Sequence, residues 1–185
     1  MHIKGTFYAG RRQSITERFG EAAWQRFEAE LKQQVPGFAR LITPASQVSA
    51  ADYIAFQELM VRTFYSGNMQ VLWTMGYDSA GWALTEGPYA RLLSGAQRGL
   101  STIESLMKRL WGVYCDEGRF SAFASEGGFE LEVDQMKTWH LSIELTSMGY
   151  GHKVIELVTE KTAKPKRIHG AAEGRLGCRY RFTLS

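Results

Sequence analysis

Residues 120–134 read FSAFASEGGFELEVD, and the predicted fold class depends on their pattern. From Phe129 to Asp134 apolar residues alternate strictly with acidic ones, which is typical of a strand with one buried face and one wet face. The Gly127-Gly128 pair separates this run from Phe120–Ala124, so the two runs predict a β-hairpin. The chain therefore changes from helical to β-structure near Gly118.

Downstream of the hairpin, the sequence predicts one helix and two further strands. Lys137 to Met148 has helical periodicity, and Gly149-Tyr150-Gly151 has the form of a C-cap. Val154 to Thr162 is predicted as a strand, and Gly177 to Leu184 alternates apolar with polar side chains, which predicts another. We expect these strands and the hairpin to form one four-stranded antiparallel sheet with helices over one face.

Upstream of the hairpin the chain reads as helical. Ser14-Ile15-Thr16-Glu17 has the capping-box form, and apolar residues then recur every four positions until Pro36-Gly37. This pattern predicts one amphipathic helix. Ser49 and Asp52 offer the N-cap of a second helix, which we expect to end at Ser66-Gly67-Asn68.

A third upstream segment extends from Met69 to Leu93 and contains several breaking residues. We expect Gly76, Gly81 and the Gly87-Pro88 pair to divide it into two or more pieces. Ser101 is expected to cap the last helix of this half.

The predicted fold class is α+β, with a helical N-terminal half packed on a four-stranded antiparallel β-sheet formed mainly by the C-terminal half. We expect residues 1–185 to form a single domain. Its helical part would cover about 1–117 and its sheet-rich part about 118–185.

Basic and acidic residues are nearly balanced, 22 against 19, and interleave through most of the chain, so composition does not indicate a nucleic-acid partner. The basic excess is local, in Lys161–Arg167 followed by His169. We interpret residues 161–169 as a solvated hairpin loop. The alternative is an electrostatic contact with a phosphate-bearing lipid, a nucleic acid or an acidic partner. No aromatic residue interleaves with these charges, which argues against single-stranded nucleic acid.

Cys115 and Cys178 are the only cysteines, and they stand far apart in no paired spacing. Such cysteines are typical of reduced thiols in a cytosolic protein, and we interpret both as packing residues. The sequence has no basic-then-apolar leader and no apolar run of the roughly 18 to 20 residues that a membrane span requires. We therefore expect a cytoplasmic protein without a transmembrane segment.

No motif in the sequence assembles a reactive site. The four histidines, His2, His140, His152 and His169, have no metal-binding spacing, and there is no phosphate-binding glycine loop or nucleophile elbow. His140 and Glu144 are four residues apart on one predicted helix face. We interpret them as a surface contact, with a ligand or proton-transfer pair as the alternative. We expect no enzymatic activity, no metal and no cofactor.

Aromatic and methionine side chains are concentrated in the predicted helices. They either fill a core or line an apolar cavity, since helices broken by glycines over a sheet leave room for a small hydrophobic molecule. The sequence does not decide between these two interpretations. The candidate pocket residues are Phe56, Met60, Phe64, Trp73, Trp82, Met107, Trp111 and Trp139.

Several local signatures resemble a known superfamily. Lys4-Gly5-Thr6-Phe7 followed by Phe19-Gly20-Glu21-Ala22-Ala23-Trp24 is similar to the opening of haem-nitric-oxide/oxygen-binding (H-NOX) domains. Ala172–Phe182 looks like the corresponding part of ligand-binding domains of the 4-vinyl-reductase type. The lysine-glycine-x-phenylalanine start, and Met148-Gly149 before Val154, resemble a domain family expanded in myxobacteria. The small TRAPP vesicle-tethering subunits share the fold class.

This resemblance implies an α+β fold whose relatives hold haem, aromatic effectors or an acyl chain, and often dimerise. The haem site itself is not carried over. H-NOX domains hold haem with a proximal histidine and a tyrosine-x-serine-x-arginine clamp. Here Tyr77-Asp78-Ser79-Ala80-Gly81 is a partial match, with glycine where the arginine should stand. His140 follows the hairpin, whereas the proximal ligand is expected in the helical region.

Three functions are consistent with these observations. The preferred one is a non-catalytic ligand-binding sensor or regulatory domain with an apolar pocket for a small hydrophobic molecule. The alternative is a dimeric protein–protein adaptor or signalling module without a small-molecule ligand. A haem-based gas sensor comes third. The expected partners are a small hydrophobic ligand and a second copy or another protein, whereas nucleic acid is not expected.

Overall fold

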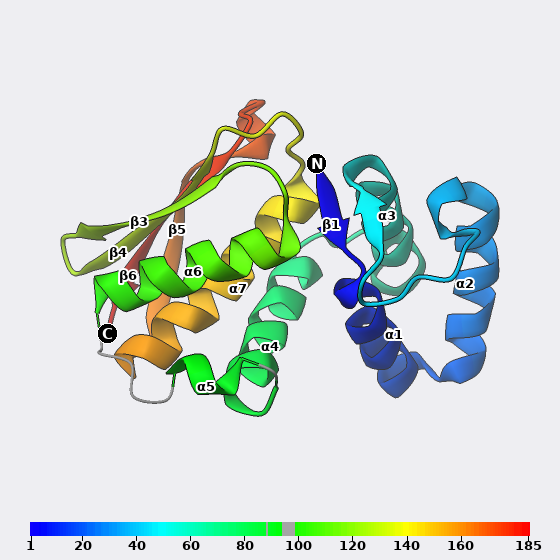
Figure 1. The fold of residues 1–185 in the computed structure, drawn as a ribbon, viewed down its shortest axis with the longest axis horizontal. Coiled ribbons are helices and arrows are strands. Elements are labelled where there is room, and N and C mark those ends of the chain that lie inside the picture. Colours follow the sequence, from blue (N-terminus) through cyan, green and yellow to red (C-terminus); the bar gives the residue numbers. More distant parts are fainter. Residues whose placement is uncertain (88, 94–98) are drawn as a thin grey trace. The chain divides into compact units, whose positions relative to one another are not determined.

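The computed structural model describes residues 1–87, 89–93 and 99–185. These residues form two compact units, and most of their helices and strands are labelled in Figure 1. Unit 1 contains Met1–Asn68 and Tyr114–Asp116, and unit 2 contains Met69–Val113 and Glu117–Ser185.

Unit 1 combines helices with a two-stranded antiparallel sheet, in which Ile3 lies opposite Val48. Its elements are β1 (His2–Lys4), α1 (Thr6–Phe19), α2 (Glu21–Gln34), the 3-10 helix η1 (Pro36–Phe38), β2 (Gln47–Ser49) and α3 (Ala50–Tyr65). The predicted N-cap of α3 is confirmed, because the backbone N–H of Asp52 donates to Ser49 Oγ at 3.1 Å.

The single helix predicted from Ser14 to Pro36 is wrong, because two helices occupy this stretch. Helix α1 begins at Thr6, so Ser14 lies inside it and caps nothing. It ends at Phe19, and its C-cap is Gly20, whose φ of 88° lies in a region that side-chain-bearing residues rarely adopt. Helix α2 then starts at Glu21 and buries Trp24, Phe27 and Leu31.

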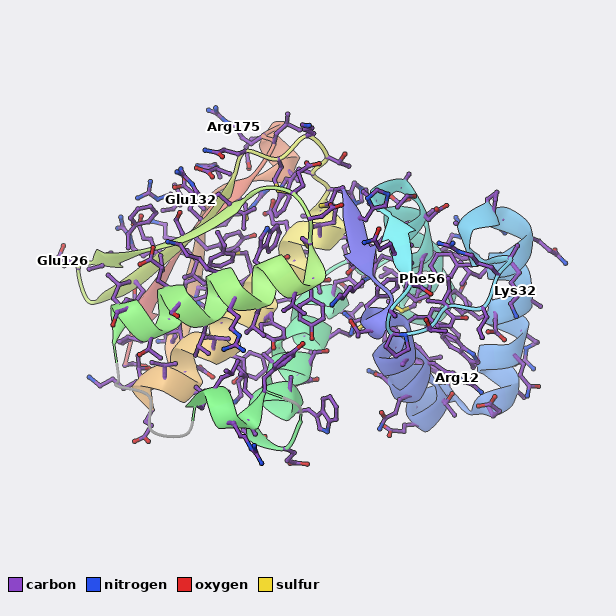
Figure 2. All side chains as sticks on the ribbon, viewed as in Figure 1. Arg12, Lys32, Phe56, Glu126, Glu132 and Arg175 are labelled. Atoms are coloured by element: carbon purple, nitrogen blue, oxygen red, sulfur yellow. The ribbon has the colours of Figure 1, made fainter. Side chains whose placement is uncertain are left out.

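Aromatic rings from α1, α2, η1 and α3 build the core of unit 1. Phe56 is fully buried, and its ring centroid lies 5.3–5.8 Å from those of Phe7, Tyr8, Phe27 and Phe38. Figure 2 shows Phe56 among the helices of this unit, with Arg12 and Lys32 on helix surfaces. The core is therefore held mainly by burial of apolar rings.

Unit 2 carries the four-stranded sheet, with strand order β3-β4-β6-β5 and every neighbouring pair antiparallel. The predicted α+β class, with this sheet formed by the C-terminal part of the chain, is confirmed. Its elements are α4 (Val71–Thr85), α5 (Ala90–Leu93), α6 (Leu100–Tyr114), β3 (Arg119–Ser125), β4 (Gly128–Asp134), α7 (Leu141–Thr159), β5 (Ala163–His169), the 3-10 helix η2 (Ala171–Glu173) and β6 (Cys178–Leu184).

Helix α4 runs unbroken through Gly76 and Gly81, so the predicted division there is wrong. A methyl group at Gly76 would overlap the carbonyl oxygen of Thr146 in α7, and one at Gly149 would overlap that of Trp73 in α4. The two glycines thus let α4 and α7 approach backbone to backbone, and this contact offsets their low helix propensity.

The end of α4 and the start of α6 lie close to the predicted boundaries. Helix α4 ends at Thr85, shortly before Gly87, whereas Pro88 lies outside the described residues. Ser101 lies inside α6, which begins one residue earlier at Leu100, so the predicted cap is wrong.

Helix α7 continues through Gly149-Tyr150-Gly151, so the predicted C-cap and the strand predicted from Val154 to Thr162 are wrong. Val154, Ile155 and Val158 form part of the buried face of α7, where packing overrides their preference for strands. Strand β5 covers most of the basic segment that we interpreted as a loop. None of the helices in the described ranges is long and apolar enough to cross a membrane.

Candidate functional site

The predicted pocket residues divide between the two units. Phe56 and Met60 are fully buried in α3, and Phe64 lies 5.0 Å from the Phe19 ring and 5.3 Å from the Phe27 ring. Phe56 and Phe64 thus pack with other aromatic side chains of unit 1, and Met60 is buried in the same helix.

Three predicted residues of unit 2 gather around Phe120 of β3. The Trp111 ring lies 6.0 Å from that of Phe120 and 6.4 Å from that of Trp139. Met107 and Phe120 both border Gly151 of α7, since a methyl group there would lie 3.5 Å from Met107 Cε and 3.9 Å from Phe120 Cζ. Met107, Trp111, Phe120 and Trp139 are called the aromatic layer below.

The remaining two tryptophans of the prediction have different surroundings. Trp73 of α4 lies against β6, with its ring 5.4 Å from Tyr180 and 6.4 Å from Phe182. Trp82, also in α4, is 60% exposed, so its side chain is largely in solvent.

A fully buried carboxylate, Glu144, joins α7 to the C-terminal strands. Its Oε1 accepts hydrogen bonds from Arg167 Nε at 2.7 Å and from Tyr180 Oη at 2.8 Å. Its Oε2 accepts from Trp139 Nε1 at 3.2 Å and from the backbone N–H of Ala171 at 2.6 Å. These donors come from β5, β6, η2 and the segment before α7, so one side chain holds four parts of unit 2 together. We call this the Glu144 network.

The guanidinium of Arg167 extends the Glu144 network toward η2. Its Nη1 donates to Glu173 at 3.0 Å, and Glu173 in turn accepts from the N–H of Gly170 at 2.7 Å. Burial alone would lower the pKa of Arg167, but the hydrogen bond to Glu144 and the charges of Glu144 and Glu173 together outweigh this effect and raise the pKa. Burial and the hydrogen bond to Glu144 raise the pKa of Tyr180, which keeps this phenol protonated.

The predicted contact between His140 and Glu144 takes a different form. His140 is the N-cap of α7, where its Nδ1 accepts from the backbone N–H of Ser142 at 3.2 Å. Glu144 instead turns toward Arg167 and Tyr180. Sequence reasoning missed this network because the donors lie 23 and 36 residues further along the chain. The available signal was a carboxylate placed between Ile143 and Leu145 on an apolar helix.

A second polar cluster, the His152 network, joins α4, α7 and β5. His152 Nε2 lies 2.8 Å from the carbonyl oxygen of Ala163, which can only accept, so this nitrogen carries the proton. His152 Nδ1 then accepts from Trp73 Nε1 at 3.3 Å. Glu156 accepts from the N–H of Ala163 at 3.0 Å and from the hydroxyl of Tyr77.

The His152 network combines a histidine, a carboxylate and a phenol, but its hydrogen bonds occupy the groups that acid–base chemistry needs. The hydrogen bond to Glu156, together with burial, raises the pKa of Tyr77. Burial would raise the pKa of Glu156, yet the bonds from Tyr77 and Ala163 hold it below its ordinary value. Tyr77 thus stays neutral and Glu156 charged, and the network ties the start of β5 to the helices.

The two cysteines offer no activated thiolate. Cys178 is fully buried, and burial raises the pKa of its thiol well above the ordinary value. Cys115 follows the C-terminal end of α6, where the helix dipole disfavours a thiolate. Within the described ranges, no group of three or more His, Cys, Asp and Glu side chains is placed to hold a metal ion.

The structure is similar over nearly its whole length to solved H-NOX proteins. An H-NOX protein from S. oneidensis in the Fe(II)NO ligation state matches with a TM-score of 0.74 and 9% identity, covering 99% of each chain. Unliganded Fe(II) H-NOX from K. algicida gives a TM-score of 0.73 at 11% identity, covering 99% of this chain and 97% of that one.

A variant of the T. tengcongensis protein gives a TM-score of 0.71 at 11% identity, covering 99% of this chain and 98% of that one. No protein-family model and no curated protein matches the sequence. At this level of identity the similarity defines the fold, which is that of H-NOX proteins.

The residues of this chain do not fit a haem. No histidine lies in α1 to α6, the helical region where the resemblance places the proximal ligand. In the partial clamp motif, the hydroxyl of Tyr77 is bound to Glu156, whose negative charge would repel a propionate. Ser79 Oγ donates to the carbonyl of Met75 at 2.7 Å, and Gly81 has no side chain.

Proposed function

We propose that this protein is a non-catalytic sensor or regulatory domain of the cytoplasm that uses the H-NOX fold without haem. We further propose that it binds a small hydrophobic molecule at the aromatic layer of unit 2. The observation that carries the first part is the replacement of the haem-holding groups. Tyr77 is bound to a carboxylate, Gly81 stands where a cation is needed, and no histidine lies in the first six helices.

The chemistry of the aromatic layer supports an apolar ligand. Both indole N–H groups are satisfied within the protein, Trp111 by the carbonyl of Glu117 at 2.8 Å and Trp139 by Glu144. Only the apolar faces of these rings are therefore available for contact with a ligand. This favours recognition of a hydrophobic molecule by shape and stacking. Trp139 also connects the layer to the Glu144 network, so a ligand that displaces this ring would disturb the hydrogen bonds of β5 and β6.

The proposal that the protein binds no haem is tested by titrating the purified protein with haemin. The S. oneidensis H-NOX protein serves as positive control. We expect no shifted Soret band under reducing conditions and no change on adding nitric oxide. A stoichiometric Soret band that responds to nitric oxide would contradict the proposal and support a gas sensor instead.

The ligand part is tested with N-phenyl-1-naphthylamine, an apolar dye whose fluorescence rises in hydrophobic sites. We expect saturable binding that Trp111→Leu weakens at least tenfold, whereas the exposed control Trp82→Leu leaves it unchanged. Circular dichroism verifies that both variants are folded. Absence of saturable binding, or equal loss in both variants, would contradict an apolar site at the aromatic layer.

A dimeric adaptor is the second candidate, and the exposed apolar side chains of unit 2 favour it. Trp82 is 60% exposed, Leu176 58% and Ile168 46%. Large exposed apolar side chains are enriched where proteins associate. Light scattering during size-exclusion chromatography separates the candidates, because a strict monomer at high concentration would remove the basis for a homodimer.

A further inference from the structure

The face of the sheet opposite its buried side chains carries most of the charge of the strands. On β6, Cys178, Tyr180 and Phe182 are buried, so the alternating Arg179 and Arg181 point to the other face. Figure 2 shows Glu132 of β4 on this outer face, directed away from α6, with Glu126 at the tip of the β3–β4 hairpin. The strand register therefore determines which charges are neighbours.

Two arginines on this face are held in a fixed arrangement by one carboxylate. Glu130 of β4 lies opposite Arg181 in the register and is only 5% exposed. Its Oε2 accepts from Arg179 Nε at 2.7 Å and its Oε1 from Arg181 Nε at 2.7 Å. The Arg179 guanidinium also lies over the ring of Phe123, 5.1 Å from the centroid. Both guanidinium groups are thus ordered before any partner binds, while their side chains remain 36% and 48% exposed.

The neighbouring strand β5 adds two cations to these arginines. Lys166 lies opposite Arg181 and Lys164 opposite Thr183, and both lysines are exposed. Within the ranges that the structure describes, neither lysine side chain forms a hydrogen bond or an ion pair. Four cations therefore face two carboxylates, Glu130 and Glu132, the second of which lies 3.9 Å from Arg179 Nη1, and this leaves the β5–β6 half of the face with a net positive charge.

We propose that the β5–β6 half of the outer sheet face binds an acidic, extended segment of a partner protein. Alternate residues of a strand lie about 6.6 Å apart, and adjacent strands about 4.8 Å apart. An extended peptide with carboxylates at every second position has nearly the same spacing as Arg179 and Arg181, or as Lys164 and Lys166. Ordered guanidinium groups bind carboxylates with little further loss of entropy.

Two features of the molecule favour a peptide on the sheet face over an added edge strand or an anionic membrane. Pro165 lacks an N–H and interrupts the donors of edge strand β5, so a partner is more readily bound on the face than added as a further strand. An anionic membrane is broad and planar, so it would also meet Glu126 at the tip of the neighbouring hairpin. A narrow peptide contacts the basic half alone. The surface involves only the sheet of unit 2, so this proposal stands independently of the hydrophobic ligand.

The test is fluorescence anisotropy with a labelled ten-residue peptide in which glutamate alternates with serine. We expect binding at low salt that weakens as salt rises, and a loss of at least tenfold in the variant Lys164→Glu/Lys166→Glu. The matched control, Arg26→Glu/Lys32→Glu, makes the same change of charge on exposed residues of α2 and should bind as the unmodified protein does.

Three outcomes would overturn the proposal. The first is no binding of the peptide by the unmodified protein, and the second is an equal loss of affinity in the control, which would indicate general charge attraction. The third is sedimentation with phosphatidylserine-containing vesicles that the variant Lys164→Glu/Lys166→Glu abolishes and that excess peptide does not reduce, which would assign the surface to a membrane.

Discussion

The cores of units 1 and 2 are built from different kinds of side chain. Unit 1 stacks rings around Phe56, with Phe7, Tyr8, Phe27 and Phe38 as its neighbours. Unit 2 buries aromatic rings too, but it also places the fully buried carboxylate of Glu144 against its sheet, with four donors around it. The stability of the first core depends on the apolar area that it buries. The stability of the second also depends on the geometry of its hydrogen bonds and on the charge of Glu144.

This difference determines how each unit should respond to substitution. Apolar packing tolerates exchanges that conserve volume, because its interactions have no preferred direction. A buried charged network tolerates little, because removing one partner leaves the others desolvated and unpaired. We therefore expect substitutions in the charged network of unit 2 to cost more stability than volume-conserving exchanges in the apolar core of unit 1.

The largest effect is expected for Glu144→Gln. The amide keeps the shape of the side chain, but its NH2 group would face donors, and Arg167 would lose its buried countercharge. We expect the free energy of unfolding to fall by about 3–5 kcal/mol, measured by urea denaturation. Glu104→Gln, which breaks the exposed 2.6 Å pair with Lys108, should cost under about 1 kcal/mol. Similar small costs in both would show that the Glu144 network is not a major source of stability.

A smaller effect is expected where helices α4 and α7 touch. Gly149→Ala would force a methyl group against the carbonyl of Trp73 and should cost about 1–3 kcal/mol. Gly10→Ala in α1 is the matched change in unit 1, because nothing lies within 4 Å of the added methyl group. It should stabilise by about 0.5–1 kcal/mol through helix propensity. If thermal unfolding showed a gain for Gly149→Ala as well, the close crossing of α4 and α7 would be wrong.

Glu130→Gln should reveal a pH dependence of unit 2. Burial would raise the pKa of Glu130, but the bonds from Arg181 and Arg179 overcome it and hold the pKa below its ordinary value. A depressed carboxyl stabilises the fold above the ordinary pKa of about 4.3, and this contribution is lost as pH falls through the folded-state pKa. We expect the variant to be less stable by about 1–2 kcal/mol at pH 7, after allowance for the partly exposed arginines.

The same comparison at low pH provides the check on Glu130. Stability curves of the protein and the Glu130→Gln variant, recorded by urea denaturation from pH 7 to pH 3, should converge as the carboxyl becomes protonated. A constant difference across this range would show that the carboxylate charge contributes nothing.

The smallest effect is expected for Leu31→Met in α2. Leu31 is fully buried in unit 1, and methionine conserves its volume and apolar character. The cost should stay below about 1.5 kcal/mol by the same denaturation measurement. A loss as large as that of Glu144→Gln would remove the contrast between the two units.

The elements that sequence patterns predict correctly are those with local causes. The β3–β4 hairpin follows from strict alternation around Gly127-Gly128, and the start of α3 follows from Ser49 and Asp52, three residues apart. Each signal is complete within a few residues, so no knowledge of the tertiary structure is needed.

The errors have tertiary causes instead. Gly149 looks like a helix end, but its lack of a side chain serves contact with α4, some 75 residues earlier in the chain. The strand-like run at Val154 becomes the buried face of the same helix. Likewise the partners of Glu144 come from β5, η2 and β6. Of the candidate pocket, Met107, Trp111 and Trp139 do lie together, whereas Trp82 is exposed because its position on α4 is set by packing that a single helix does not reveal.

Native mass spectrometry of the protein, expressed with a supply of haem and purified gently, shows whether the fold carries haem or another small molecule. A haem-free H-NOX fold with an apolar site should carry a small hydrophobic molecule, or take one up from solution, and show no haem adduct. A species carrying one haem per chain would contradict the proposal that the fold is used without haem. A protein that never acquires a small molecule would contradict the proposed apolar ligand site.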